Sequence, residues 1–209
     1  MVAVVVLTAA CGGGPRPNAI PTPAPAPSET AERAPKPVLP ATPSHAGPRD
    51  SAISDEDLSE LWTRQLMVPV EGVTRAQLRD NYTAGRATGR IHGALDILAP
   101  QGTAILAPSD QVIGRLGEGS VGGIFIYAHD ADGRFVYYYA HLERYRRGLA
   151  VGDRVAKGSV IGYVGTTGNA PKNTPHLHFQ VMKRGAGRAW WDGSPINPFT
   201  YFAADGNRP

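Results

Sequence analysis

The spacing of hydrophobic residues changes twice along the chain. An apolar run of small residues fills the first 11 positions, and a stretch rich in proline, alanine and small polar residues follows as far as about residue 50. From Ser54 to Pro69, large side chains recur every three or four positions, which predicts a helix. Beyond Gly85, short apolar runs alternate with glycine, proline and Asp-Gly pairs. This last pattern is typical of strands joined by tight turns.

The sequence predicts where the helix begins and ends. Ser54, followed three positions later by Asp57, is typical of a helix N-cap. The side chains that recur at helical spacing are Leu58, Leu61, Trp62, Gln65 and Leu66. Pro69 is expected to end the helix, because proline lacks the backbone N–H group that a helix interior requires. A second short helical piece is predicted over residues 74–80.

The region after residue 85 predicts an all-β domain. Its candidate strands are 94–98, 104–107, 111–116, 123–129, 134–142, 154–164 in two pieces, and 176–182. The link Asp130-Ala131-Asp132-Gly133 joins two runs of aromatic and β-branched residues, which predicts a hairpin. We therefore expect an all-β domain of about 120 residues, preceded by a short N-terminal helix.

The first 11 residues predict an export signal rather than a membrane span, since a span takes roughly 20 apolar residues. Cys11 ends this run in Leu7-Thr8-Ala9-Ala10-Cys11-Gly12. The segment resembles a bacterial lipobox, although Thr8 stands where leucine is usual. This resemblance implies cleavage before Cys11 and a lipid on its sulfur, with a plain signal peptide or a buried apolar end as alternatives. Gly12 is no inner-membrane retention signal, so we expect a lipoprotein of the outer membrane that faces the periplasm.

Residues 12–50 have too little apolar surface to form a core, and their prolines cannot donate ladder hydrogen bonds. We expect a disordered, extended Pro/Ala-rich linker. The expected organisation is therefore a signal or lipobox segment over 1–11, the linker over 12–50, a helical lead-in over 51–80 and the β domain over 81–209.

Charge and cysteine content narrow the classes of partner and site. The net charge of +3 favours approach to an anionic polymer such as the bacterial cell wall. Basic residues are scattered, with only Arg144, Arg146 and Arg147 close together, so we expect no nucleic-acid partner. Cys11 is the only cysteine, which excludes an internal disulfide and a zinc site made of several thiolates.

Four of the six histidines and one aspartate lie in three short motifs of the β region. The motifs are His92-Gly93-Ala94-Leu95-Asp96, Tyr139-Ala140-His141-Leu142 and His176-Leu177-His178-Phe179. Side chains at even separations along a strand share a face, so His92 is expected to point the same way as Asp96, and His176 the same way as His178. Imidazole and carboxylate are good zinc ligands, and a catalytic zinc ion usually takes three protein ligands.

The region from about Pro69 to Phe202 resembles the LytM/lysostaphin-type zinc metallopeptidases. The resemblance rests on the three motifs and on the segments 97–103, 151–162 and 164–170. It implies the duplicated hybrid motif fold, a barrel-sandwich-like arrangement of antiparallel sheets. It also implies that residues 81–209 form a zinc-dependent endopeptidase domain that hydrolyses peptide cross-links of bacterial peptidoglycan.

The resemblance assigns roles to five residues: the Zn²⁺ ligands His92, Asp96 and His178, and, beside the reacting water, His141 and His176. One of the two histidines outside the ligand set takes a proton from the water, and either can hydrogen-bond the oxyanion. Which histidine does which stays open. Ala94 replaces the glycine that is more usual in the first motif of this family, which leaves every ligand in place.

Alternatives remain for the function and for several segments. A non-catalytic LytM-like regulator, which activates a cell-wall amidase, shares the fold but has typically lost metal ligands. A biotinyl-type carrier needs a lysine at an exposed tight turn, whereas Lys157 lies where a strand begins. The loops 117–123 and 165–169 are interpreted as walls of a substrate groove or as simple turns. His45 in the linker is expected to be solvated, and His129 to end a hairpin. The bond cleaved, a D-alanyl cross-link or a glycine bridge, also stays open.

Overall fold

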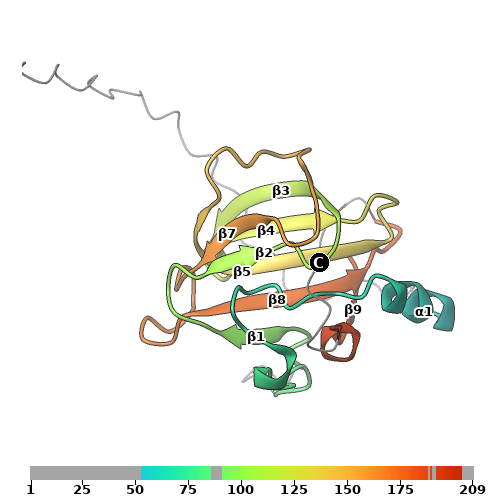
Figure 1. The fold of residues 1–209 in the computed structure, drawn as a ribbon, viewed down its shortest axis with the longest axis horizontal. Coiled ribbons are helices and arrows are strands. Elements are labelled where there is room, and N and C mark those ends of the chain that lie inside the picture. The colour runs from blue at the N-terminus through green and yellow to red at the C-terminus, as the bar shows by residue number, and fades with distance from the viewer. Residues whose placement is uncertain (1–52, 86–90, 188, 190–191, 204–209) are drawn as a thin grey trace, which may run out of the picture. The chain divides into compact units, whose positions relative to one another are not determined.

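In the computed structural model of the chain, the described residues are 53–85, 91–187, 189 and 192–203 (Figure 1). All of them belong to the second of two compact units, Val38–Pro209. The predicted signal segment, the linker, Cys11 and His45 lie outside the described residues. Within the described part of the chain, no helix is long and apolar enough to cross a membrane.

Helix α1 (Asp55–Thr63) begins where the sequence predicts. The Ser54 hydroxyl accepts from the Asp57 backbone N–H, and the Asp57 carboxylate accepts from the Ser54 N–H. Each side chain thus satisfies the backbone N–H of the other residue. The helix ends earlier than predicted, because Gln65 adopts a φ of 47° and Leu66 pairs with Phe202. Burial of Leu66 thus overrides the helical pattern. The second helical piece is the 3₁₀ helix η1 (Arg75–Gln77).

Asp57 also joins α1 to the sheet. Its buried carboxylate contacts Arg134 Nε at 2.9 Å and Lys183 Nζ at 2.6 Å. Although burial raises the pKa of Asp57, hydrogen bonds from Lys183, Ser54 and Arg134 outweigh it and hold the pKa well below its usual range. Trp62, which the helical pattern included, is largely exposed, and its ring lies 6.2 Å from that of Tyr201.

The described residues form nine strands, all paired antiparallel. They are β1 (Leu95–Leu98), β2 (Ala104–Leu106), β3 (Gln111–Gly119), β4 (Gly123–His129), β5 (Phe135–Tyr145), β6 (Arg154–Val155), β7 (Val160–Val164), β8 (His176–Lys183) and β9 (Ser194–Ile196). The predicted all-β class is confirmed. The sequence analysis missed β9, a short strand with Pro195 at its centre, which pairs with β8 alone among the strands described here.

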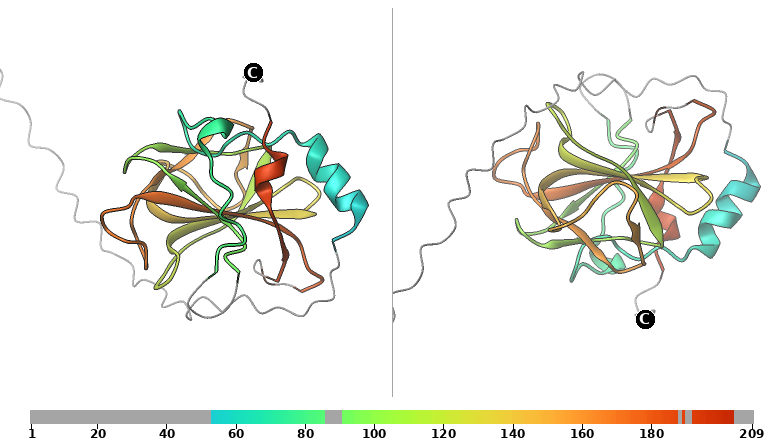
Figure 2. Two further views of the ribbon diagram at one scale, coloured as in Figure 1. Left: turned by 90° about the horizontal axis from the view of Figure 1, so that it is seen from below. Right: turned by 90° about the horizontal axis from the view of Figure 1, so that it is seen from above.

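Strand β5 connects two parts of the sheet, as Figures 1 and 2 show. The strand order is β1-β8-β5-β4-β3-β6, and β7 links β2 to β5. Residues Phe135 to Ala140 of β5 pair with β8, whereas Leu142 to Tyr145 pair with β7. His141 lies at the change of partner and has a φ of 64°, which is uncommon for a residue with a side chain. The register against β4 also shifts here, because Ile124 pairs with Leu142 whereas Ile126 pairs with Tyr139.

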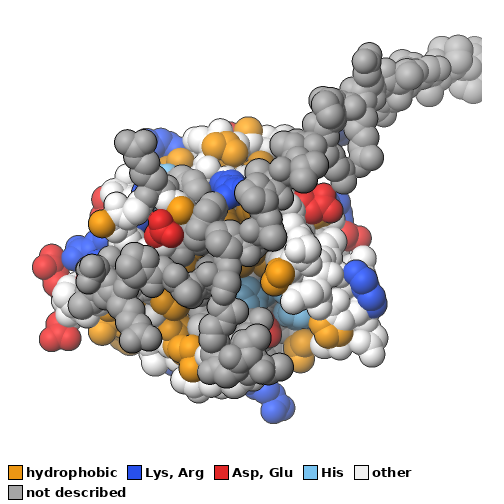
Figure 3. Space-filling model, turned by 180° about the vertical axis from the view of Figure 1, so that it is seen from behind, with side chains coloured by type: hydrophobic (Ala, Val, Ile, Leu, Met, Phe, Trp, Pro, Cys, Tyr) orange, Lys and Arg blue, Asp and Glu red, His pale blue; other side chains and the backbone are white. Residues whose placement is uncertain are grey.

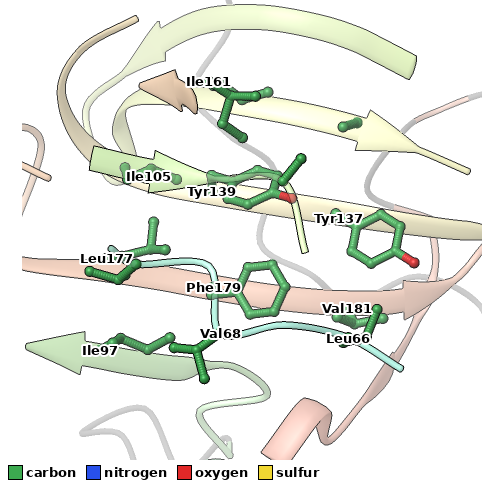
Figure 4. Close-up of a cluster of buried hydrophobic side chains, with 14 of the residues drawn as sticks. Leu66, Val68, Ile97, Ile105, Tyr137, Tyr139, Ile161, Leu177, Phe179 and Val181 are labelled. Carbon is green, nitrogen blue, oxygen red and sulfur yellow. The ribbon is translucent and has the colours of Figure 1, made fainter. Parts of the chain in front are cut away.

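The larger of two buried hydrophobic clusters in the described residues lies on one face of β5 and β8. Tyr137 and Tyr139 of β5 pack with Leu177 and Phe179 of β8, and the rings of Tyr139 and Phe179 are 5.3 Å apart (Figure 4). Burial of each such side chain contributes about 1.5–3 kcal/mol. Because side chains alternate along a strand, this burial turns the residues between them to the opposite face. His178, between Leu177 and Phe179, is therefore on that face.

Candidate metal centre

Three donor atoms converge on the face opposite the core. Asp96 Oδ1 lies 3.1 Å from His92 Nε2 and 2.8 Å from His178 Nδ1, and these two nitrogens are 3.2 Å apart. Ligand atoms around a tetrahedral zinc ion are about 3.3 Å apart, because Zn–N and Zn–O bonds are about 2.0–2.1 Å long. The group could therefore hold a metal ion with only small adjustments.

Strand pairing brings two of these residues together. Asp96 in β1 is the register partner of His178 in β8. Residues directly opposite each other in an antiparallel pair have Cβ atoms about 4.5–5.5 Å apart, which suits two ligands of one ion. Two residues 82 positions apart in the sequence thus become neighbours through the sheet.

His92 reaches the site by a different route from the one predicted. The expectation that His92 and Asp96 share a strand face is wrong, because β1 begins at Leu95 and Gly93 has a φ of 68°. The His92 segment instead pairs with an earlier segment: His92 N donates to Ala84 O and Gly93 N to Tyr82 O. A turn at Gly93 therefore aims His92 at the site.

A backbone carbonyl sets the tautomer of His92. Its Nδ1 lies 3.1 Å from Asn81 O, and since a carbonyl only accepts, Nδ1 carries the proton. The lone pair of Nε2 is then free to face Asp96 and His178. A metal-binding histidine is commonly oriented by a hydrogen bond of this kind.

The two other motif histidines lie beside this group. His141 Nδ1 donates to Thr167 O and His176 Nδ1 donates to Thr174 O, each over 2.9 Å. Both therefore keep a free lone pair on Nε2. The ring centroid of His141 is 4.9 Å from that of His176 and 5.7 Å from that of His178.

All five residues that the sequence analysis singled out thus come together in the structure. His176 Nε2 is 3.9 Å from Asp96 Oδ1, so His176 lies directly beside the three donor atoms. Histidine side chains gather on one face of the domain in Figure 3.

The surroundings favour an ionised Asp96 and a neutral His141. Although burial raises the pKa of Asp96, the neighbouring imidazoles of His178 and His92 outweigh it and hold the pKa well below the usual range. Burial and the neighbouring His178 lower the pKa of His141 to about 4. At neutral pH the site therefore offers a carboxylate for a cation and, at His141, an imidazole that can accept a proton.

Two residues that support the site escaped the sequence analysis. Asn81 contacts both His92 and Asp96, and Thr167 contacts His141 through its carbonyl oxygen. Neither lies in a motif of metal-binding residues. A backbone carbonyl can belong to any residue type, so the pattern of side chains carries no signal for such a contact.

The two glycine-rich loops lie against each other next to His141. Asn169 N donates to Val121 O, and His141 N donates to Gly122 O. A Cβ on Gly168 would lie only 2.3 Å from Val121 O, so the approach requires glycine. The loops are therefore close-packed turns at the edge of the site, a position that also suits groove walls.

Two further residues occupy structural positions. His129 ends β4, where it pairs with Val136 of β5, and its Nδ1 is 2.6 Å from Asp130 O. This position agrees with the predicted hairpin end. The expectation that Lys157 lies where a strand begins is wrong, because it lies in the turn between β6 and β7. Its Nζ donates to Gln65 O, so the ammonium group ties this turn to the chain after α1.

The curated proteins that resemble this chain include several that are named endopeptidases. The L-Ala--D-Glu endopeptidase of Bacillus subtilis is 34% identical over 111 residues, which is 51% of this chain and 33% of that protein. The DD-carboxypeptidase/endopeptidase Mpg of Neisseria meningitidis is 38% identical over 112 residues, 53% of this chain and 23% of that protein. The chain thus spans a third or less of the length of these curated relatives.

A solved structure and a family description agree with these relatives. The catalytic domain of the antimicrobial peptidase lysostaphin from Staphylococcus simulans matches with a TM-score of 0.51 and 29% identity, covering 61% of this chain and 93% of that domain. Residues 90–198, more than half of the chain, match the description of Peptidase family M23. The expected relationship to the LytM/lysostaphin type is confirmed, and the chain belongs to peptidase family M23.

Proposed function

We propose that the domain is a zinc-dependent endopeptidase that hydrolyses peptide cross-links of bacterial peptidoglycan. The observation that carries the proposal is the convergence of His92 Nε2, Asp96 Oδ1 and His178 Nδ1 to within 3.2 Å of one another. Two imidazole and one carboxylate donor form a common set for catalytic zinc. The names of the relatives, which are endopeptidases, support the same reaction.

The residues divide into two sets with different tasks. His92, Asp96 and His178 would hold the ion, which supplies Lewis-acid polarisation and lowers the pKa of water. His141 and His176 each direct a free Nε2 to the site, since their Nδ1 atoms donate to backbone carbonyls. One Nε2 can take the proton from the attacking water, and a protonated imidazole can then donate to the oxyanion or the leaving amine.

The test separates metal ligands from proton-transfer residues. His178→Ala and Asp96→Ala should be inactive and poor in zinc, because two remaining protein donors hold the ion weakly. His141→Ala should keep about one zinc per chain yet cleave cross-linked muropeptides about 10² to 10⁴-fold more slowly. The measurements are zinc content by atomic emission and a mass-spectrometric digest of defined muropeptides.

His129→Ala is the matched control, because this histidine ends β4 and should change neither zinc content nor rate. Loss of zinc in His141→Ala together with retention in His178→Ala would reverse the assignment of the two sets. The same digest identifies the bond cleaved, whether a D-alanyl cross-link or a glycine bridge.

The intact donor set argues against the alternative of a non-catalytic regulator. A regulator that only activates an amidase has no need of three converging donor atoms with two further histidines beside them. Under that interpretation, purified protein would hold no stoichiometric zinc and would cleave no muropeptide on its own. One zinc per chain together with cleavage would exclude it.

We further propose that Cys11 carries a lipid that anchors the protein in the outer membrane, facing the periplasm, with residues 12–50 as the spacer to the domain. The support is the sequence alone: a cysteine that ends an apolar run before a proline-rich stretch. Cys11→Ser should release the protein from membranes and leave the activity of the domain unchanged. Unchanged membrane fractionation of this variant would refute the anchor.

A further inference from the structure

Asn81 bonds to two of the three residues that converge at the candidate metal centre. Its backbone oxygen accepts from His92 Nδ1 over 3.1 Å. Its side-chain Oδ1 accepts from the Asp96 backbone N–H over 3.1 Å, and its Nδ2 donates to Asp96 O over 3.4 Å. One residue thus contacts the side chain of His92 and both backbone polar groups of Asp96.

The bonds to Asp96 occupy the open edge of the sheet. Among the described strands, β1 is terminal and pairs only with β8, so half of its backbone groups face away from any of these strands. The Asn81 amide has one acceptor and one donor group, which match the N–H and C=O of Asp96 as a neighbouring strand would. Asn81 therefore fixes the backbone that carries the Asp96 carboxylate.

The bond to His92 matters because His92 lies outside regular structure. Its ring direction depends on the turn at Gly93 and on the hydrogen bond that Nδ1 donates to Asn81 O. If that acceptor moves, the imidazole can rotate or change tautomer, and Nε2 no longer faces Asp96 Oδ1 at 3.1 Å.

The chain on both sides of Asn81 is tied to the C-terminal part of the domain. Tyr82 Oη donates to Pro195 O, and Asn197 Nδ2 donates to Asp80 Oδ2, both over 2.9 Å. These bonds flank Asn81 directly and restrict its backbone. The half-buried Asn81 is thereby held in place before any metal binds.

We propose that Asn81 is a positioning residue of the metal centre, which holds His92 and Asp96 in ligand geometry and so raises metal affinity. Asn81 precedes the span matched to the family, residues 90–198, so the family description does not cover it. The proposal rests on the proposed function only in taking zinc as the metal. It requires no particular substrate.

The test measures zinc affinity by competition with a chromophoric chelator, without any peptidase assay. Asn81→Ala removes both side-chain bonds to Asp96 and is expected to bind zinc about 10 to 100-fold more weakly than the unaltered chain. The visible spectrum of the Co²⁺-substituted variant should also change, because the ligand geometry relaxes. Thr83→Ala is the matched control on the same segment, since Thr83 is exposed, and should keep the original affinity and spectrum.

Thermal unfolding of the metal-free proteins separates positioning from folding. Metal-free Asn81→Ala should unfold cooperatively at a Tm close to that of the metal-free unaltered chain. The substitution then weakens zinc binding without weakening the fold. If this variant fails to fold, Asn81→Ser takes its place, because serine is too short to span both Asp96 backbone groups, and the same loss of affinity is expected.

Unchanged zinc affinity and an unchanged Co²⁺ spectrum in the variant that folds would overturn the proposal. Weakened affinity in a protein whose unaltered form binds zinc but cleaves no muropeptide would support the role of Asn81 and refute the proposed peptidase function instead. The two conclusions are therefore tested separately.

Discussion

Thr167 offers a test of how the structure holds His141. The Thr167 hydroxyl accepts from Ile124 N over 2.9 Å and donates to Leu142 O over 2.6 Å. The carbonyl oxygen of the same residue accepts from His141 Nδ1. Thr167→Val keeps the shape of the side chain but leaves one backbone N–H and one backbone C=O without their partner. The backbone around His141 should loosen as a result.

The expected cost follows from the two orphaned groups. Each buried backbone group left unsatisfied costs about 1–3 kcal/mol, and since Thr167 is half-buried, water compensates part of this. We expect a total loss of about 2 kcal/mol in the free energy of unfolding. For a domain of this size, each kcal/mol lowers Tm by roughly 2–4 °C, so Tm should fall by about 4–8 °C.

The effect on activity should exceed what the lost stability explains. His141 has a φ of 64°, and such a conformation costs about 1–3 kcal/mol and persists only where the surroundings enforce it. Without the Thr167 hydroxyl, the backbone can relax and displace the imidazole. A misplacement of about 1 Å can cost about 10²-fold in rate, so kcat should fall about 10 to 100-fold.

The assay combines thermal unfolding, zinc content and muropeptide cleavage. Thr167→Val should keep its zinc, because Thr167 contacts none of the three donor residues in the described hydrogen bonds. Thr167→Ser is the matched control, since it keeps the hydroxyl and should stay close to the unaltered chain in all three measurements. Full activity and an unchanged Tm in Thr167→Val would refute the reasoning, as would loss of zinc.

Three further outcomes are expected. Asp57→Asn leaves Arg134 and Lys183 facing a neutral amide and should lower the free energy of unfolding in urea by about 2–4 kcal/mol at pH 7. The pKa of Asp57 is held below its unfolded value, so the stabilisation by its carboxylate is complete above about pH 4 and is lost as the pH falls further. The difference in stability between the two proteins should therefore shrink at pH 3, and a constant difference would contradict this. Removal of metal with a chelator should abolish cleavage and lower Tm, and added zinc should restore both. A chain beginning at Ser51 should unfold in one cooperative transition, whereas loss of that transition would show that residues 12–50 pack on the domain.

Several parts of the structure could be predicted because they depend on local patterns. The N-cap at Ser54 and strand β4 lie where the sequence places them, since capping and the period-2 alternation of strands are properties of neighbouring residues. The pair His176 and His178 could be placed on one face for the same reason. The residue types that converge at the site were therefore evident from the sequence by itself.

Tertiary structure decided how those residues meet. It places His92 outside the strand, shifts the register of β5 at His141 and ends α1 before Leu66, because burial and strand pairing between distant segments outweigh local preference. It also supplies Asn81 and Thr167 as supports, partly through carbonyl oxygens that every residue type possesses. The sequence by itself determined which side chains could bind a metal, and only the packed fold determined their geometry, since that geometry depends on contacts between segments up to 117 positions apart.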